Sequence, residues 1–125
     1  MKHIKLFEVK YKLNNNSPQL NDYVICEDEW INNTIKHSDK NNIKDLQDAA
    51  NIIRNNIGQY VDNAVVDAAT LYTIKYDANI IPEHLIEYFS NNGPNTRNFY
   101  RIEITHFSPN KEDLEAILSS TKYNI

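Results

Sequence analysis

The sequence predicts an α+β fold, in which one mixed or antiparallel sheet of about four strands is covered mainly on one face by about three helices, in the order β-β-α-β-α-β-α. Three observations support this fold class. Within the strands expected over residues 4–13 and 97–107, apolar and polar residues alternate from Phe7 to Leu13 and from Tyr100 to Thr105, which is the period of a half-buried strand. Apolar residues recur every three or four positions over residues 43–57, which is the period of a helix. The length of 125 residues is that of one domain, residues 1–125.

The first part of the chain predicts two strands. In residues 4–13, Phe7, Val9 and Tyr11 share one face while lysines occupy the other, which is typical of a strand with one face in solvent. Residues 23–27 are expected to form the second strand, and the short turn-rich link before them indicates a hairpin. Residues 28–42 are ambiguous between a short helix and a loop that packs on the domain.

The middle of the chain predicts a helix followed by one strand. The helix over residues 43–57 is the clearest element, and Gly58 stands where a left-handed C-terminal residue is favoured. A single strand is expected over residues 65–76, which are rich in residues that favour strands. Alternation places Tyr72 on one face of this strand and Lys75 on the other.

The last part predicts a helix, a strand and a final helix. Pro82 suits the first turn of a helix that ends before Gly93. Residues 97–107 follow as a strand. Residues 108–120 form the closing helix, with acidic residues in its first turn where they match the helix dipole.

Composition excludes several classes of function. A net charge of -4 argues against a general nucleic-acid binder, and the only two glycines cannot build a glycine-rich phosphate loop. Cys26 is the only cysteine, so neither an internal disulfide nor a cysteine-based zinc cage is expected, and we interpret it as a buried, inert thiol. No signal peptide, membrane span or cofactor is expected, which predicts a cytoplasmic protein. Abundant Asn, Ile, Lys and Tyr indicate an AT-rich genome, such as that of a phage or another mobile element.

Residues 97–107 carry two arginines, a glutamate and a histidine within a single run. Alternation assigns them to faces, on the assumption that the run is one strand. The residues expected to face the helices are Tyr100, Ile102, Ile104 and His106. The residues expected to face solvent are Arg101, Glu103 and Thr105. The structural interpretation is that Arg101 and Glu103 form cross-strand pairs while His106 closes the edge of the core.

The solvent face of the sheet is the best candidate for a binding surface. It is expected to be moderately basic, with acidic residues gathered on the helices, and Leu71 gives it apolar character. The candidate ligand- or partner-binding residues are Lys10, Lys12, Tyr72, Lys75, Arg97, Tyr100, Arg101, Glu103 and His106.

Catalytic and metal-binding patterns are weak. His84 and Glu87 lie one turn apart on a predicted helix, but no third ligand accompanies them in the sequence. Asp45 and Asp48 are paired carboxylates that also suit the exposed start of a helix. No catalytic residue and no metal ligand is therefore assigned, and the chain is expected to be a binding protein more than an enzyme.

The favoured hypothesis is a small inhibitor or accessory protein of a phage or another mobile element, of the anti-defence or immunity type, that contacts a protein target. One alternative is a nucleotide or RNA ligand held by basic and aromatic side chains of the sheet face. A second, less favoured alternative is a weak, metal-independent ribonuclease using residues such as Arg97, Arg101 and Glu103. A homodimer is also open.

Overall fold

The computed structural model describes residues 17–38 and 43–123. The predicted strand over residues 4–13, with Lys10 and Lys12, lies outside these residues. The described elements, in chain order, are β1 (Tyr23–Cys26), α2 (Glu29–His37), α3 (Lys44–Asn55), β2 (Gly58–Val66), β3 (Ala69–Lys75), the 3-10 helices η2 (Ala78–Ile80) and η3 (Glu83–Phe89), β4 (Thr96–Tyr100), the 3-10 helix η4 (Arg101–Glu103), β5 (Ile104–Ser108) and α4 (Lys111–Tyr123).

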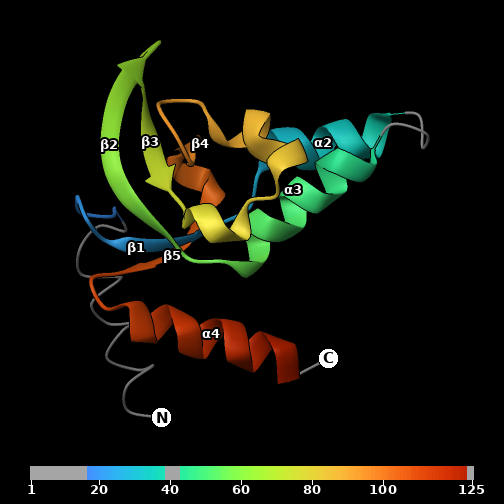
Figure 1. Cartoon of the computed structure of the whole chain (residues 1–125). Coiled ribbons are helices and arrows are strands. Elements are labelled where there is room, and N and C mark those ends of the chain that lie inside the picture. Colours follow the sequence, from blue (N-terminus) through green and yellow to red (C-terminus); the bar gives the residue numbers. More distant parts are fainter. Residues whose placement is uncertain (1–16, 39–42, 124–125) are drawn as a thin grey trace.

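One antiparallel sheet organises the domain, with the strand order β4-β3-β2-β1-β5. The predicted α+β class is confirmed, with five strands in the described part of the chain where about four were expected. The two outermost strands, β4 and β5, follow each other in the chain and are joined by η4 alone. The sheet is strongly bent, which gives it a concave and a convex face (Figure 1).

The helices divide between these two faces. α2, α3 and η3 lie on the concave side, whereas α4 lies on the opposite side of β1 and β5, which it contacts (Figure 1). Because side chains alternate along β1, this strand contributes side chains to both faces of the sheet. Val24 and Cys26 belong to the concave core, while Ile25, only 5% exposed, points the other way. The prediction that helices gather mainly on one face is therefore correct for the elements that precede α4.

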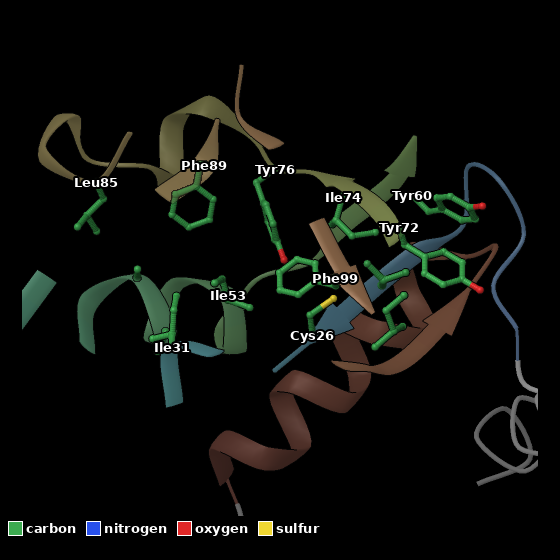
Figure 2. Close-up of a cluster of buried hydrophobic side chains, with 14 of the residues drawn as sticks. Cys26, Ile31, Ile53, Tyr60, Tyr72, Ile74, Tyr76, Leu85, Phe89 and Phe99 are labelled. Atoms are coloured by element: carbon green, nitrogen blue, oxygen red, sulfur yellow. The ribbon is translucent and has the colours of Figure 1, made fainter. Parts of the chain in front are cut away.

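The main core fills the space between the concave face and α2, α3 and η3 (Figure 2). Its aromatic members meet edge to face, with ring centroids 5.1 Å apart for Tyr60 and Tyr72 and 5.7 Å apart for Tyr76 and Phe89. Edge-to-face contact aligns the positive edge of one ring with the negative face of the other. The fully buried side chains include Ile31, Ile53, Ile74, Leu85, Phe89 and Phe99.

The helix predicted over residues 43–57 is confirmed as α3, because Leu46, Ala50 and Ile53 recur on its buried side. The ambiguous residues 28–42 contain α2, which begins after the capping residue Asp28. The expected role of Gly58 as a helix cap is wrong, since it is the first residue of β2. A Cβ atom there would lie 2.3 Å from Cγ2 of Ile74, so close strand packing requires the glycine.

The single strand predicted over residues 65–76 is in fact the turn and second half of a hairpin. β2 and β3 pair as far as Val66 and Ala69, and the two residues between them have positive φ angles of 51° at Asp67 and 66° at Ala68. Two left-handed residues in succession are the signature of a type I′ turn, which fits the twist of a hairpin. The predicted faces of β3 hold, because Tyr72 is buried and Lys75 is exposed.

The single strand predicted over residues 97–107 is interrupted by η4, and the faces assigned to Tyr100, Ile102 and Glu103 are wrong. Beyond η4, Ile104 is buried and Thr105 is exposed, as expected. Ile102 is 80% exposed and Glu103 only 7%, which reverses the expectation for both. The cause is the Glu103 carboxylate, which accepts hydrogen bonds from the main-chain nitrogens of Tyr100 and Glu29, both at 2.8 Å. A side chain that satisfies two main-chain donors favours a turn over a continuous ladder.

Residues 83–89 were expected to be an α-helix and are the 3-10 helix η3. Of the three side chains expected on its buried side, Leu85 and Phe89 are buried, whereas Ile86 is 51% exposed, so that part of the prediction is wrong. The closing helix is confirmed as α4, and its buried Leu114 faces the convex side of the sheet. None of the helices in the described part of the chain combines the length and apolar character that crossing a bilayer needs.

Candidate functional site

The residues proposed from sequence do not form one site. Tyr72 belongs to the concave core, whereas Lys75 and Tyr100 are exposed on the convex face. On that face, Leu71 is the direct partner of Tyr100. The remaining described candidates take part in interactions within the domain.

Arg97 is held in a buried ion pair. Its Nε donates to Oδ2 of Asp28 at 2.5 Å, and its Nη1 donates to the carbonyl of Tyr88 at 3.0 Å. The Arg97 and Asp28 side chains are only 11% and 3% exposed. The other oxygen of Asp28 accepts from the main-chain nitrogen of Ile31 and so caps α2. This guanidinium connects β4 to the start of α2.

Glu103 completes the same buried network. Burial raises the pKa of its carboxyl group, against the lowering effect of the hydrogen bonds from Tyr100 and Glu29 and of the nearby Arg97 charge. A buried carboxylate with two main-chain donors is satisfied locally, as buried polar groups generally are. We therefore assign Arg97 and Glu103 to the support of η4 and α2.

Arg101 packs against its own turn. Its Nη1 donates to the carbonyl of Ile104 at 3.0 Å, and its guanidinium carbon lies 5.2 Å from the centre of the Phe107 ring. A guanidinium over an aromatic face is attracted by the ring quadrupole. The two contacts hold η4 against β5.

His106 lies opposite Ile25 in the pairing of β5 with β1. It is half-buried, and burial lowers the pKa of its imidazole. Its Nδ1 lies 3.1 Å from Oγ1 of Thr105. The prediction that His106 occupies the edge of a packed layer is consistent with this position.

Cys26 is fully buried, as expected. Burial raises the pKa of its thiol, and the nearby carboxylates of Glu103 and Asp28 act in the same direction. Burial and the neighbouring Cys26 also raise the pKa of the Tyr76 hydroxyl. A thiol without solvent access and with a raised pKa is a poor nucleophile.

Lys75 borders an open cleft of about 220 Å³ where β1, β2, β3 and the start of α4 meet. Lys111 supplies a second ammonium group, and Asp77 places a carboxylate in the same lining. The cleft therefore has mixed charge. The two lysines could attract an anion, and Asp77 would oppose it.

The convex face carries an apolar surface that the sequence only partly indicated. Strand register sets Ala64 opposite Leu71, Leu71 opposite Tyr100, and Val66 opposite Ala69, so these side chains share one face. We call them the hairpin patch, defined as Ala64, Val66, Ala69, Leu71 and Tyr100. Tyr100 is 48% and Val66 is 43% exposed.

A polar row marks one boundary of the hairpin patch. Asp62, Thr73 and Asn98 lie side by side across β2, β3 and β4, and Oγ1 of Thr73 donates to Oδ1 of Asn98 at 2.7 Å. The Asn92 amide covers this row, since its Nδ2 lies 3.2 Å from Oγ1 of Thr73 and 3.3 Å from Oδ2 of Asp62. The apolar surface is therefore confined to the turn end of the hairpin.

The structure brings together three side chains that sequence reasoning left apart. Asp45 and Asp48 on α3 both face His84 on η3, with His84 Nε2 3.9 Å from a carboxylate oxygen of each. The sequence had instead linked His84 with Glu87. The i,i+3 spacing of the aspartates was visible, but nothing local indicated which histidine would approach them.

Comparisons of the chain with protein-family models, curated proteins and solved structures found no match.

Proposed function

We propose that this chain is a binding protein whose hairpin patch docks onto a basic surface of a partner protein. In this proposal it acts as an inhibitor or accessory protein of a phage or another mobile element, of the anti-defence or immunity type. The single observation that carries the proposal is the register of β2, β3 and β4, which gathers five apolar side chains on one face. Contiguous exposed apolar surface bordered by polar residues is typical of protein interfaces.

Two further apolar side chains are exposed on elements next to the patch. Val65, on the other face of the hairpin tip, is 73% exposed, and Ile102, two residues after Tyr100, is 80% exposed. η4, which carries Ile102, contacts β3 and β4. Large side chains exposed to this degree are removed from water when a partner covers them, which favours association.

The charge around the patch favours a basic partner. Between Gly58 and Ile74 the chain contains Asp62 and Asp67 and no lysine or arginine. Both aspartates are exposed, close to the apolar residues of the hairpin. Opposite charges at the rim of an interface accelerate encounter and exclude partners of the wrong charge. A nucleic-acid-binding groove on a target protein has the required positive charge.

The edge of β4 argues for docking on the face of the sheet. The main-chain nitrogens of Asn98 and Tyr100 donate to Oδ1 of Asn91 at 2.9 Å and to Oε1 of Glu103 at 2.8 Å. These donors are therefore already occupied by side chains of the same molecule. Side chains that occupy an edge in this way disfavour the addition of a strand from another chain.

The test is affinity capture from host extract, followed by purification of the captured protein. The variants are Val66→Lys and Tyr100→Lys, each of which places a positive charge in the patch. The control is Ile86→Lys, because Ile86 is an exposed apolar residue (51%) on η3. We expect a basic protein that the wild type and the control retain, that both patch variants lose and that added salt releases, since screening weakens exposed charge interactions.

A molar excess of the wild type should inhibit the activity of the purified target, and the same excess of each patch variant should not. The proposal is wrong if the captured protein binds the patch variants as well as the wild type. It is also wrong if light scattering shows a dimer that the patch variants convert to a monomer, because a second copy would then occupy the patch.

A further inference from the structure

Asp45, Asp48 and His84 converge where η3 lies against α3. The two aspartates are three residues apart on α3 and so lie on the same side of the helix. Nε2 of His84 is 3.9 Å from Oδ1 of Asp45 and 3.9 Å from Oδ2 of Asp48. One donor atom from each residue lies within 4.8 Å of the other two. These are the donor types and the spacing of a divalent-cation site.

The backbone under these side chains is fixed by the core. Leu46 and Ala49, which adjoin the two aspartates on α3, are 8% and 0% exposed. Leu85, which follows His84, is fully buried, and its main-chain nitrogen donates to the carbonyl of Pro82 at 2.9 Å. The three donor groups are therefore carried on rigid elements, which lowers the cost of assembling them around an ion.

We propose that Asp45, Asp48 and His84 bind a divalent first-row transition metal ion, and that Zn²⁺ is the preferred ion. Imidazole nitrogen favours Zn²⁺ over Ca²⁺ or Mg²⁺, which take oxygen ligands. A tetrahedral zinc ion holds its donors at about 2.0–2.2 Å, and therefore about 3.4 Å from one another. The side chains are exposed by 51%, 30% and 56%, so they can rotate by the small amount needed. Water completes the coordination.

The positive charge of Lys44 weakens the affinity of the site for a cation. Its Nζ lies 3.0 Å from Oδ1 of Asp48, the oxygen that does not face His84. The ammonium group thus leaves the other oxygen directed at the site, while its charge opposes the approach of a cation. Removing this charge is expected to strengthen metal binding. A purely structural role for the acidic residues would not give this result.

The experiment is a calorimetric titration of the EDTA-treated full chain with ZnCl₂ at pH 7.5, combined with thermal unfolding. We expect saturable binding of one ion per chain and a rise in Tm, because an ion that joins α3 to η3 stabilises the folded state. His84→Gln and Asp48→Asn should each raise the Kd at least tenfold. Lys44→Gln should lower the Kd.

His37→Gln is the matched control, because His37 is an exposed histidine at the end of α2. It should bind zinc with the affinity of the wild type. Absence of saturable heat with the wild type, or wild-type affinity in both His84→Gln and Asp48→Asn, would overturn the assignment. A loss of affinity in His37→Gln equal to that in His84→Gln would place the ion elsewhere.

Discussion

Arg97 and Asp28, which are 69 residues apart in the chain, form an ion pair that is almost entirely enclosed by the domain. The pair joins β4 to the capping residue of α2, while Glu103 holds the start of the same helix through the main-chain nitrogen of Glu29. Three charged side chains thus fix one helix terminus. Their burial explains why they are not available as a binding surface.

Replacement of Arg97 by alanine should destabilise the fold strongly. The substitution leaves the Asp28 carboxylate buried without its partner, which typically costs about 3–5 kcal/mol. Urea denaturation of the purified protein measures the change in the free energy of unfolding. The matched control is Arg54→Ala, because Arg54 pairs with Glu27 at 2.7 Å with 44% and 34% of the two side chains exposed.

The control should cost about 1 kcal/mol or less, since water screens an exposed pair. Equal costs for Arg97→Ala and Arg54→Ala would contradict the account of a buried, structurally essential pair.

Ala68→Gly should stabilise the protein. Ala68 has a φ of 66°, in the left-handed region that an L-residue with a Cβ atom adopts at a cost and glycine does not. We expect a gain of about 0.5–1 kcal/mol after allowance for the greater freedom of glycine in the unfolded chain.

Ala64→Gly in the neighbouring strand is the control. Ala64 lies within β2, where glycine should destabilise by about 0.5–1 kcal/mol. Parallel thermal or urea unfolding of the two variants measures the contrast. If both variants lose stability, the turn is not the type I′ turn described.

The half-buried His106 predicts a loss of stability in mild acid. Burial lowers the pKa of its imidazole below the ordinary value of 6.5. The unfolded chain therefore binds more protons than the folded chain as the pH falls through this range, so the free energy of unfolding decreases with decreasing pH. His106→Gln should remove this contribution, whereas the exposed His37→Gln should retain it.

The measurement is the difference in the free energy of unfolding between each variant and the wild type from pH 8 to pH 5. The raised pKa of Glu103 acts in the opposite direction, because its folded form gains a proton more readily than its unfolded form. The subtraction cancels this effect, since all three proteins contain Glu103. A flat difference for His106→Gln across the range would refute the prediction.

The spacing of apolar residues was sufficient to predict an element where that spacing is regular from one end of the element to the other. The steps of three and four at Leu46, Ala50 and Ile53 predicted α3, and the two-residue rhythm of β3 assigned Tyr72 and Lys75 to the correct faces. The prediction failed where the chain turns and no glycine or proline marks the turn. Asp67 and Ala68 form a left-handed turn that normally contains Asn-Gly or Asp-Gly, so one strand was predicted where a hairpin exists.

The interruption at η4 had a different cause. From Tyr100 to Thr105 the apolar and polar letters alternate without a gap, and only the position of the Glu103 carboxylate between the main-chain nitrogens of Tyr100 and Glu29 explains why the chain turns. A contact across 74 residues cannot be read from a local window. This is why the predicted faces of Ile102 and Glu103 were wrong.

The sequence by itself determined the α+β class, the burial of Cys26 and the buried sides of α3 and α4, because each depends on composition or on the spacing of near neighbours. Only the tertiary structure decided that Arg97 would be buried against Asp28, that five apolar residues would meet in the hairpin patch, and that His84 would approach Asp45 and Asp48. Each of these depends on strand order and on the packing of η3 against α3, which are set by the whole core.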